Sequence, residues 1–167
     1  MTARTAIGAM FFVLAGLLLT GCAVGPRLDS ASVDTQLTPS RAVAMGKQVS
    51  GRRVLWGGVI VSTTNLKHST RIEVLGYPLD RTQRPQTDAH PLGRFLVDRP
   101  GYLESADYAS GRLITLTGAV TGLHAGHVGQ ARYVYAVVVP DHLYLWPADS
   151  ERNGSGLHFG IGVLFHN

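Results

Sequence analysis

The hydrophobic and polar positions of this chain change their period along its length and define three stretches. Residues 6–19 are apolar without interruption, residues 23–33 have no apolar period, and residues 53–146 contain short apolar runs separated by turn residues. The first stretch has the length of a signal-peptide core and is shorter than the ~20 residues of a membrane-spanning helix. The third stretch has the pattern of a domain built from β-strands.

Six segments of the third stretch are rich in β-branched or aromatic residues and are predicted to be strands: residues 53–62, 69–79, 93–97, 113–121, 133–139 and 143–146. Gly57 and Gly58 interrupt the first of them and predict a bulge or a sharp coil. Residues 99–101 and 122–130 are predicted to be turns, and Pro140 with Asp141 predicts a break between the last two strands.

A short helix is predicted ahead of the strands, over residues 39–45, with Thr38 as its N-cap, Pro39 as its first residue and Gly46 at its end. One helix and five or six short strands predict a mainly β fold, and closure into a small antiparallel β-barrel removes exposed strand edges. We therefore expect an OB-fold-like barrel, that is, one resembling the oligonucleotide-binding fold.

The predicted organisation has four parts. A signal peptide occupies residues 1–21, a lipidated flexible tether residues 22–36, the barrel residues 37–149, and a Gly-rich tail residues 150–167. For the tail, the sequence leaves open an edge strand, a contact with the membrane or another protomer, and disorder.

The N-terminus carries a targeting signal. Arg4 precedes the apolar run, and Leu19-Thr20-Gly21-Cys22 follows it and resembles the lipobox of bacterial lipoproteins. In that motif a diacylglycerol is attached to the cysteine before cleavage just ahead of it, so Cys22 is the predicted membrane anchor. In bacterial lipoproteins an aspartate after this cysteine usually retains the protein in the inner membrane. Ala23 therefore favours the outer membrane, on its periplasmic face. The alternative is a secreted protein with an incidental cysteine.

The cysteine content and the net charge limit the kinds of chemistry that this chain can perform. The chain has one cysteine, so no internal disulfide can form, and acylation of Cys22 leaves no thiol for nucleophilic catalysis. The net charge of +4 is consistent with attraction to anionic lipid, lipopolysaccharide or nucleic acid, and equally with an ordinary solvated surface.

Candidate catalytic groups are sparse. His124 and His127 have a metal-ligand spacing, with Asp141 and His142 as further donors, but the two histidines fall in a predicted Gly-rich turn and no HExxH is present. The sequence also lacks GxSxG and Walker motifs. We expect no enzymatic activity, no cofactor and no metal. The alternative is a metal-dependent hydrolase that uses His124 and His127.

Aromatic and basic side chains offer a possible binding surface, made of Trp56, Tyr77, Arg94, Tyr102 and Tyr108. Such groups stack on sugars or bases or accept a peptide. The alternative is that most of them pack in the core. Glu73 is expected to face solvent or to pair with an arginine such as Arg52 or Arg94.

Several short stretches of the barrel region occur in a characteristic order: residues 51–60, 72–80, 93–96, 101–104, 111–112, 133–139 and 145–147. In these stretches the chain resembles the Slp family of outer-membrane lipoproteins, with Tyr102 and Glu104 in place of phenylalanine and aspartate. The resemblance implies an outer-membrane lipoprotein linked to starvation or stationary phase, without an established enzymatic activity or catalytic residues to transfer.

These observations together predict a protein anchored in the outer membrane by lipid on Cys22. We expect a non-enzymatic binding or structural role in the cell envelope, related to stress or starvation, with an envelope protein or glycan as the partner. An OB-type module for a glycan or a nucleic acid is the alternative, although we expect no nucleic acid as partner.

Overall fold

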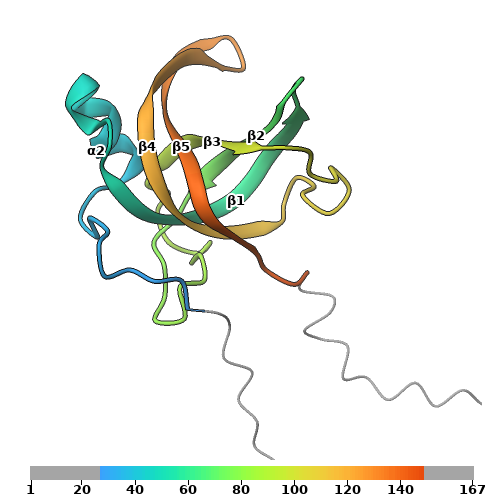
Figure 1. Cartoon of the computed structure of the whole chain (residues 1–167), viewed down its shortest axis with the longest axis horizontal. Coiled ribbons are helices and arrows are strands. Elements are labelled where there is room, and N and C mark those ends of the chain that lie inside the picture. Colours follow the sequence, from blue (N-terminus) through green and yellow to red (C-terminus); the bar gives the residue numbers. More distant parts are fainter. Residues whose placement is uncertain (1–26, 149–167) are drawn as a thin grey trace, which may run out of the picture.

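The computed structural model describes residues 27–148. A short helix, α2 (Pro39–Ala44), and a 3-10 helix, η1 (Gly46–Val49), precede five strands: β1 (Arg53–Asn65), β2 (Ser69–Gly76), β3 (Gly93–Pro100), β4 (Leu113–Val128) and β5 (Ala131–Leu145). The strands form a closed barrel in the order β1-β2-β3-β5-β4 (Figure 1). β3 and β5 pair in parallel, and all other neighbours are antiparallel. The predicted mainly β, OB-fold-like barrel with one N-terminal helix is confirmed.

The segment before β1 closes one end of the barrel. The Thr38 hydroxyl accepts a hydrogen bond from the Arg41 amide at 3.3 Å, so the predicted cap is confirmed. Ala42 of α2 and Val49 of η1 are fully buried and join the core. No helix within residues 27–148 has the length and apolarity that crossing a bilayer requires.

Inward-facing side chains from every strand fill the barrel; Val54, Ile72, Phe95, Leu116 and Val138 have no exposed surface. Close backbone contact, and not the predicted bulge, explains the glycine pair of β1. At Gly58, β1 pairs with both β2 and β4, and a Cβ there would lie 2.0 Å from the Leu75 carbonyl oxygen. The bulge of this strand falls at Val61, which the register with β2 skips.

The predicted turn over residues 122–130 is wrong. β4 continues to Val128, and two residues, Gly129 and Gln130, connect it to β5. The reason is tertiary packing, because Leu96, Tyr135 and Val137 form a second buried cluster on the outer side of the barrel. This packing outweighs the high glycine content of the segment. The resulting β4–β5 hairpin extends from the barrel and curls over at the top of Figure 1.

The predicted break at Pro140 and Asp141 is also wrong, because β5 runs through both and unites the last two predicted strands. The register with β4 passes from Pro140 to His142, so Asp141 is the extra residue of a bulge. Proline is tolerated at such a position, since the ladder is already interrupted there. The Asp141 carboxylate pairs with Arg53 at 2.7 Å.

Candidate functional site

The polar segment between the predicted lipidation site and α2 contacts the barrel over its described part. The Leu28 amide donates to Gln83 Oε1 at 2.8 Å, and Gln83 Nε2 donates to the Leu28 carbonyl at 3.0 Å. Farther along, the Asp34 amide donates to the Arg53 carbonyl at 2.8 Å, and the Asp34 carboxylate pairs with Arg52. Cys22 itself lies outside the described residues.

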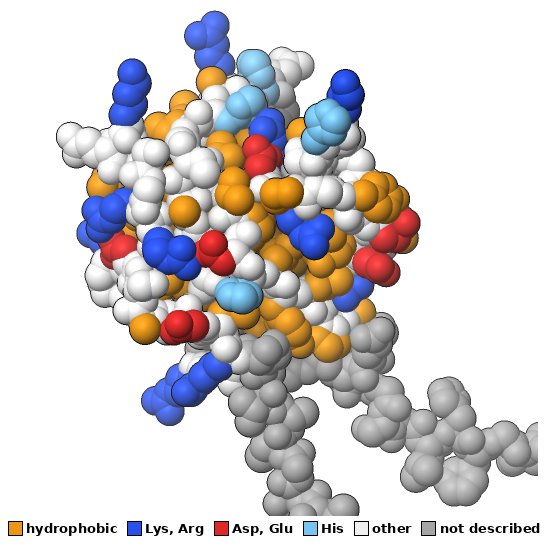
Figure 2. All heavy atoms as spheres, in the orientation of Figure 1, with side chains coloured by type: hydrophobic (Ala, Val, Ile, Leu, Met, Phe, Trp, Pro, Cys, Tyr) orange, Lys and Arg blue, Asp and Glu red, His pale blue; other side chains and the backbone are white. Residues whose placement is uncertain are grey.

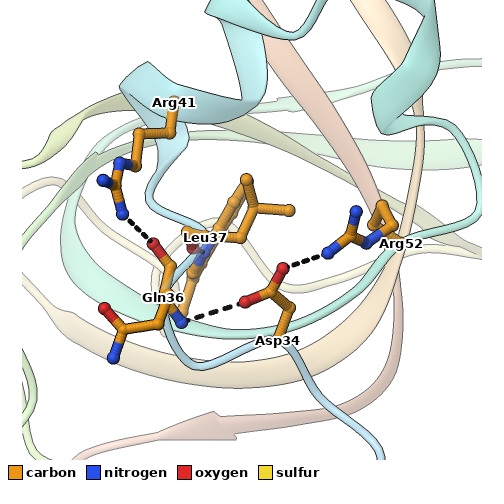
Figure 3. A network of polar contacts seen from close by, with 6 residues as sticks. Asp34, Gln36, Leu37, Arg41 and Arg52 are labelled. Atoms are coloured by element: carbon orange, nitrogen blue, oxygen red, sulfur yellow. Dashed lines mark hydrogen bonds and ion pairs between the residues drawn. The ribbon is translucent and has the colours of Figure 1, made fainter.

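A small polar network orders the end of this segment (Figure 3). The Gln36 amide donates to Asp34 Oδ1 at 3.0 Å, and the Arg41 guanidinium donates to the Gln36 carbonyl at 3.0 Å. These groups border an open surface cavity of about 360 Å³, whose remaining lining is Leu37, Ala44 and Met45. The network therefore links the segment to α2.

A second cavity, which we name the hairpin pocket, lies on the β4–β5 hairpin. It has a volume of about 400 Å³ and is lined by Ala125, Gly126, His127, Arg132, Tyr133 and Val134. Arg132 contributes a guanidinium and His127 an imidazole, both of which can donate hydrogen bonds, whereas no carboxylate lines the pocket. The hairpin pocket is therefore suited to an anionic group beside an apolar one.

Two tyrosines of β5 beside the hairpin pocket make polar contacts with neighbouring strands. The Tyr133 and Tyr135 rings lie 4.7 Å apart, and the Tyr133 hydroxyl accepts a hydrogen bond from the Arg94 amide at 3.0 Å. The Tyr135 hydroxyl lies 3.0 Å from the His127 carbonyl oxygen and 3.3 Å from the Glu73 carboxylate. Burial and the negative charge of Glu73 raise the pKa of Tyr135, so its hydroxyl stays protonated and remains a donor.

The outer face of β2 and β3 carries paired charges. Glu73 forms an ion pair with Arg94 at 2.6 Å, which is one of the two arginines expected as its partner. Arg71 holds Asp98 through two hydrogen bonds of 2.7 Å each. OB-folds commonly use this face to bind oligonucleotides or oligosaccharides. Here both arginines are neutralised by carboxylates, which lowers the attraction of this face for a polyanion.

The residues of the predicted binding surface occupy different environments. Trp56 is 5% exposed and packs on Phe95 in the core, whereas Tyr102 is 66% exposed and bonds to Glu104 at 3.1 Å. Tyr77 lines a separate cavity of about 400 Å³, and Tyr108 packs against the core. With Arg94 paired to Glu73, the five predicted residues are not gathered on one surface.

His124 and His127 do not converge. Both are exposed residues of β4, three positions apart, so their side chains point to opposite faces of the strand. Within residues 27–148, no three His, Cys, Asp or Glu side chains lie close enough together to hold a metal ion.

Sequence reasoning missed the hairpin pocket because residues 122–130 were assigned to a turn. Gly126 was the available signal, since a glycine within a strand often marks close approach of another group. A Cβ at Gly126 would lie 3.1 Å from the ring of Tyr135, so the small residue lets the hairpin close on that ring.

Comparisons with known proteins give a consistent family. The model of the outer membrane lipoprotein Slp family matches residues 19–160. The uncharacterized lipoprotein YeaY of Escherichia coli is 31% identical over 130 residues, which cover 75% of this chain and 67% of YeaY. An uncharacterized protein of Haemophilus influenzae is 32% identical, with 82% of this chain and 75% of that protein covered.

More distant similarities were also found. The outer membrane protein Slp of Escherichia coli is 26% identical over 58% of this chain and 50% of that protein. Among solved structures, Schizosaccharomyces pombe Pot1pC bound to single-stranded DNA has a TM-score of 0.32 and 11% identity, over 75% of this chain and 91% of that one. On the match across residues 19–160 and the identities with the Escherichia coli and Haemophilus influenzae relatives, this chain belongs to the Slp family of outer membrane lipoproteins.

Proposed function

We propose that lipid on Cys22 anchors this protein in the outer membrane, with the barrel on the periplasmic face. The proposal is supported by the lipobox-like sequence behind an apolar run, by Ala23 in the position after the cysteine, and by membership of a family of outer membrane lipoproteins. Two or three acyl chains hold a protein to a bilayer almost irreversibly, at about 0.8 kcal/mol per buried CH₂.

The barrel acts in this position as a non-enzymatic binding or structural module of the envelope. The observation that carries this part is the hairpin pocket, with the guanidinium of Arg132 and the imidazole of His127 beside apolar side chains. The position of the hairpin pocket in the fold also supports a binding role. The first residues of β4 lie near Gln83, which is bonded to Leu28. The last residues of β4 form one side of the hairpin, at the opposite end of the strand (Figure 1). The hairpin pocket is thus remote from the point where the chain leads back to Cys22.

The anchor is tested with two substitutions of the full-length precursor. Cys22→Ser removes the acceptor sulfur and is expected to give an unprocessed, unlipidated chain that is lost from the outer-membrane fraction. Ala23→Asp keeps lipidation and is expected to move the protein to the inner membrane. Outer-membrane partition and gel mobility that do not change in Cys22→Ser would refute the anchor.

The binding role is tested by photocrosslinking in living cells, because the partner is an envelope protein or a glycan. A photoreactive residue at Val134 probes the hairpin pocket, and one at Tyr102, which is also exposed, is the control. We expect adducts from position 134 that decrease several-fold when Arg132→Glu reverses the charge. Adducts with peptidoglycan are recognised because muramidase releases them. Equal labelling from both positions, insensitive to Arg132→Glu, would argue against the hairpin pocket as a binding site.

The metal-dependent alternative predicts stoichiometric zinc. Since His124 and His127 point to opposite faces of β4, we expect the purified protein to contain no stoichiometric zinc. Elemental analysis of the protein from zinc-supplemented cells is the measurement. One zinc ion per chain, lost in His124→Ala, would overturn the non-enzymatic proposal.

A further inference from the structure

Gln83 has an unusual backbone conformation. Its φ of +66° is positive, which no other non-glycine residue within residues 27–148 shows. For a residue with a Cβ, this conformation is sterically disfavoured. Its amide donates to the Asp80 carbonyl at 2.9 Å, and its carbonyl accepts from the Thr115 hydroxyl at 2.7 Å. These contacts fix the residue in place, and such outliers often mark functional positions.

The fixed backbone of Gln83 presents its side chain to the N-terminal segment. The amide group of Gln83 bonds both the N–H and the C=O of Leu28, as a neighbouring strand would. The loop around it, residues 77–92, is itself ordered by Asp80, whose carboxylate accepts from the Thr82 and Arg84 amides at 2.7 and 3.0 Å. Gln83 therefore acts as a latch between this loop and Leu28.

Attachment continues from Leu28 to α2. Arg53 Nε donates to the Ser32 hydroxyl at 3.2 Å, the Asp34 amide donates to the Arg53 carbonyl of β1, and the Asp34 carboxylate pairs with Arg52 just before that strand. Leu37 is 5% exposed, and its carbonyl accepts from Trp56 Nε1 at 2.6 Å. The chain is thus joined to the barrel from Leu28 onward, nine residues before the predicted start of the domain at Leu37.

The free connection to Cys22 is consequently short. Five residues, 23–27, separate Cys22 from Leu28, and a fully extended chain spans about 20 Å over that distance. A compact body of this size is about 35 Å across. A connection shorter than the diameter of the barrel prevents free rotation of the barrel above the bilayer.

We propose that loop 77–92 faces the lipid headgroups of the membrane, and that the β1–β2 and β4–β5 hairpins point away from it. This orientation rests on the proposed lipidation of Cys22. The described chain begins beside this loop at the lower edge of Figure 1, and basic side chains project from the same edge in Figure 2. Arg27 and Arg81 are exposed at this end and suit contacts with headgroup phosphates.

The end of the described chain lies at the same loop. Arg84 stacks over the Trp146 ring at 5.2 Å, and Trp146 Nε1 donates to the Thr115 hydroxyl at 2.9 Å. Residues 28 and 146 are therefore both attached around loop 77–92, whereas Lys67 lies beyond the opposite end of β2. This separation provides two positions for a test of orientation.

The experiment uses the mature lipoprotein, reconstituted into phospholipid vesicles that contain a headgroup-attached nitroxide. Arg81→Cys and Lys67→Cys are labelled separately with a fluorophore, because acylated Cys22 offers no free thiol. We expect quenching at position 81 to be several-fold stronger than at position 67. Equal quenching in protein that floats with the vesicles would overturn the orientation while leaving the anchor intact. Protein that does not float at all would instead contradict the proposed function, and this orientation with it.

Two further variants test the latch. Gln83→Gly removes the bonds to Leu28 and accepts the positive φ without strain, so the barrel stays folded. We expect it to lower quenching at position 81 toward that at position 67. Inserting ten Gly/Ser residues after Gly25 lengthens the connection and is expected to have the same effect. Quenching at position 81 that neither change alters would show that the short connection does not set the orientation.

Discussion

Trp56 and Tyr102 show how differently this barrel uses its aromatic residues. Both belong to the surface predicted from sequence, yet Trp56 fills the core beside Phe95 and Tyr102 is 66% exposed in the β3–β4 connection. The difference arises from position, because Trp56 faces inward on β1 and its indole N–H is satisfied by the Leu37 carbonyl. Aromatic type alone does not distinguish the two roles.

Substitution of these two residues is expected to have unequal effects on stability. Trp56→Ala removes a buried ring and is expected to lower the free energy of unfolding by about 3–5 kcal/mol. Tyr102→Ala is the control and is expected to change it by less than about 0.5 kcal/mol. Urea unfolding of the unlipidated Cys22→Ser chain without its signal peptide measures both. Trp56→Phe gives a milder variant if the alanine variant does not fold. Equal losses would contradict the placement of Trp56 in the core.

Tyr135 makes stability depend on alkaline pH. Its pKa is raised by burial and by Glu73 above the ordinary value of about 10, so the unfolded chain releases this proton first. The contribution of Tyr135 is therefore fully present below pH 10 and is lost as the pH rises through the folded-state value. We expect Tyr135→Phe to show a smaller loss of stability than the wild type between pH 8 and 11. Urea midpoints that fall in parallel for both proteins would contradict the raised pKa.

At the scale of elements, local signals predicted the fold well where they agreed with packing. Thr38 and Pro39 marked the helix correctly, and each predicted strand overlaps a strand of the structure, although residues 77–79 and 146 lie beyond the ends of β2 and β5. The larger errors occurred at Gly122, Gly126 and Pro140, residues with a local preference for turns, and Pro100 of a predicted turn is the last residue of β3. Long-range contacts override that preference: Leu96 and Tyr135 pack beneath the hairpin, and Asp141 forms a bulge. The hairpin pocket depends on the same contacts, and Gly126 signals it only once the segment is known to be a strand.

Gly58 tests the close approach of β1 to its neighbours. A Cβ at this position would lie 2.0 Å from the Leu75 carbonyl oxygen, which is backbone and cannot rotate away. We expect Gly58→Ala to destabilise the barrel by more than about 3 kcal/mol, or to prevent folding. Gly129→Asn is the matched control, since its φ of +57° suits asparagine and a Cβ there meets no atom within 4 Å. Thermal unfolding followed by circular dichroism compares the two, and a Gly58→Ala barrel as stable as the control would refute the close contact.

At the scale of the whole molecule, the barrel has two distinct ends. Leu28 and Trp146 are attached around loop 77–92 at one end, and the β4–β5 hairpin with its pocket extends from the other (Figure 1). A lipid on Cys22 would therefore place the first end at the membrane and direct the hairpin pocket into the periplasm. The proposed anchor, orientation and binding surface therefore depend on one another, and all three depend on acylation of Cys22.

The intact mass of the mature protein, purified from the outer membrane of a Gram-negative host, tests this arrangement most directly. We predict the mass of a chain that begins at Cys22 and carries three acyl chains, with the protein concentrated in the outer-membrane fraction. A soluble product without acyl chains, with Cys22 present as a free thiol, would contradict the account.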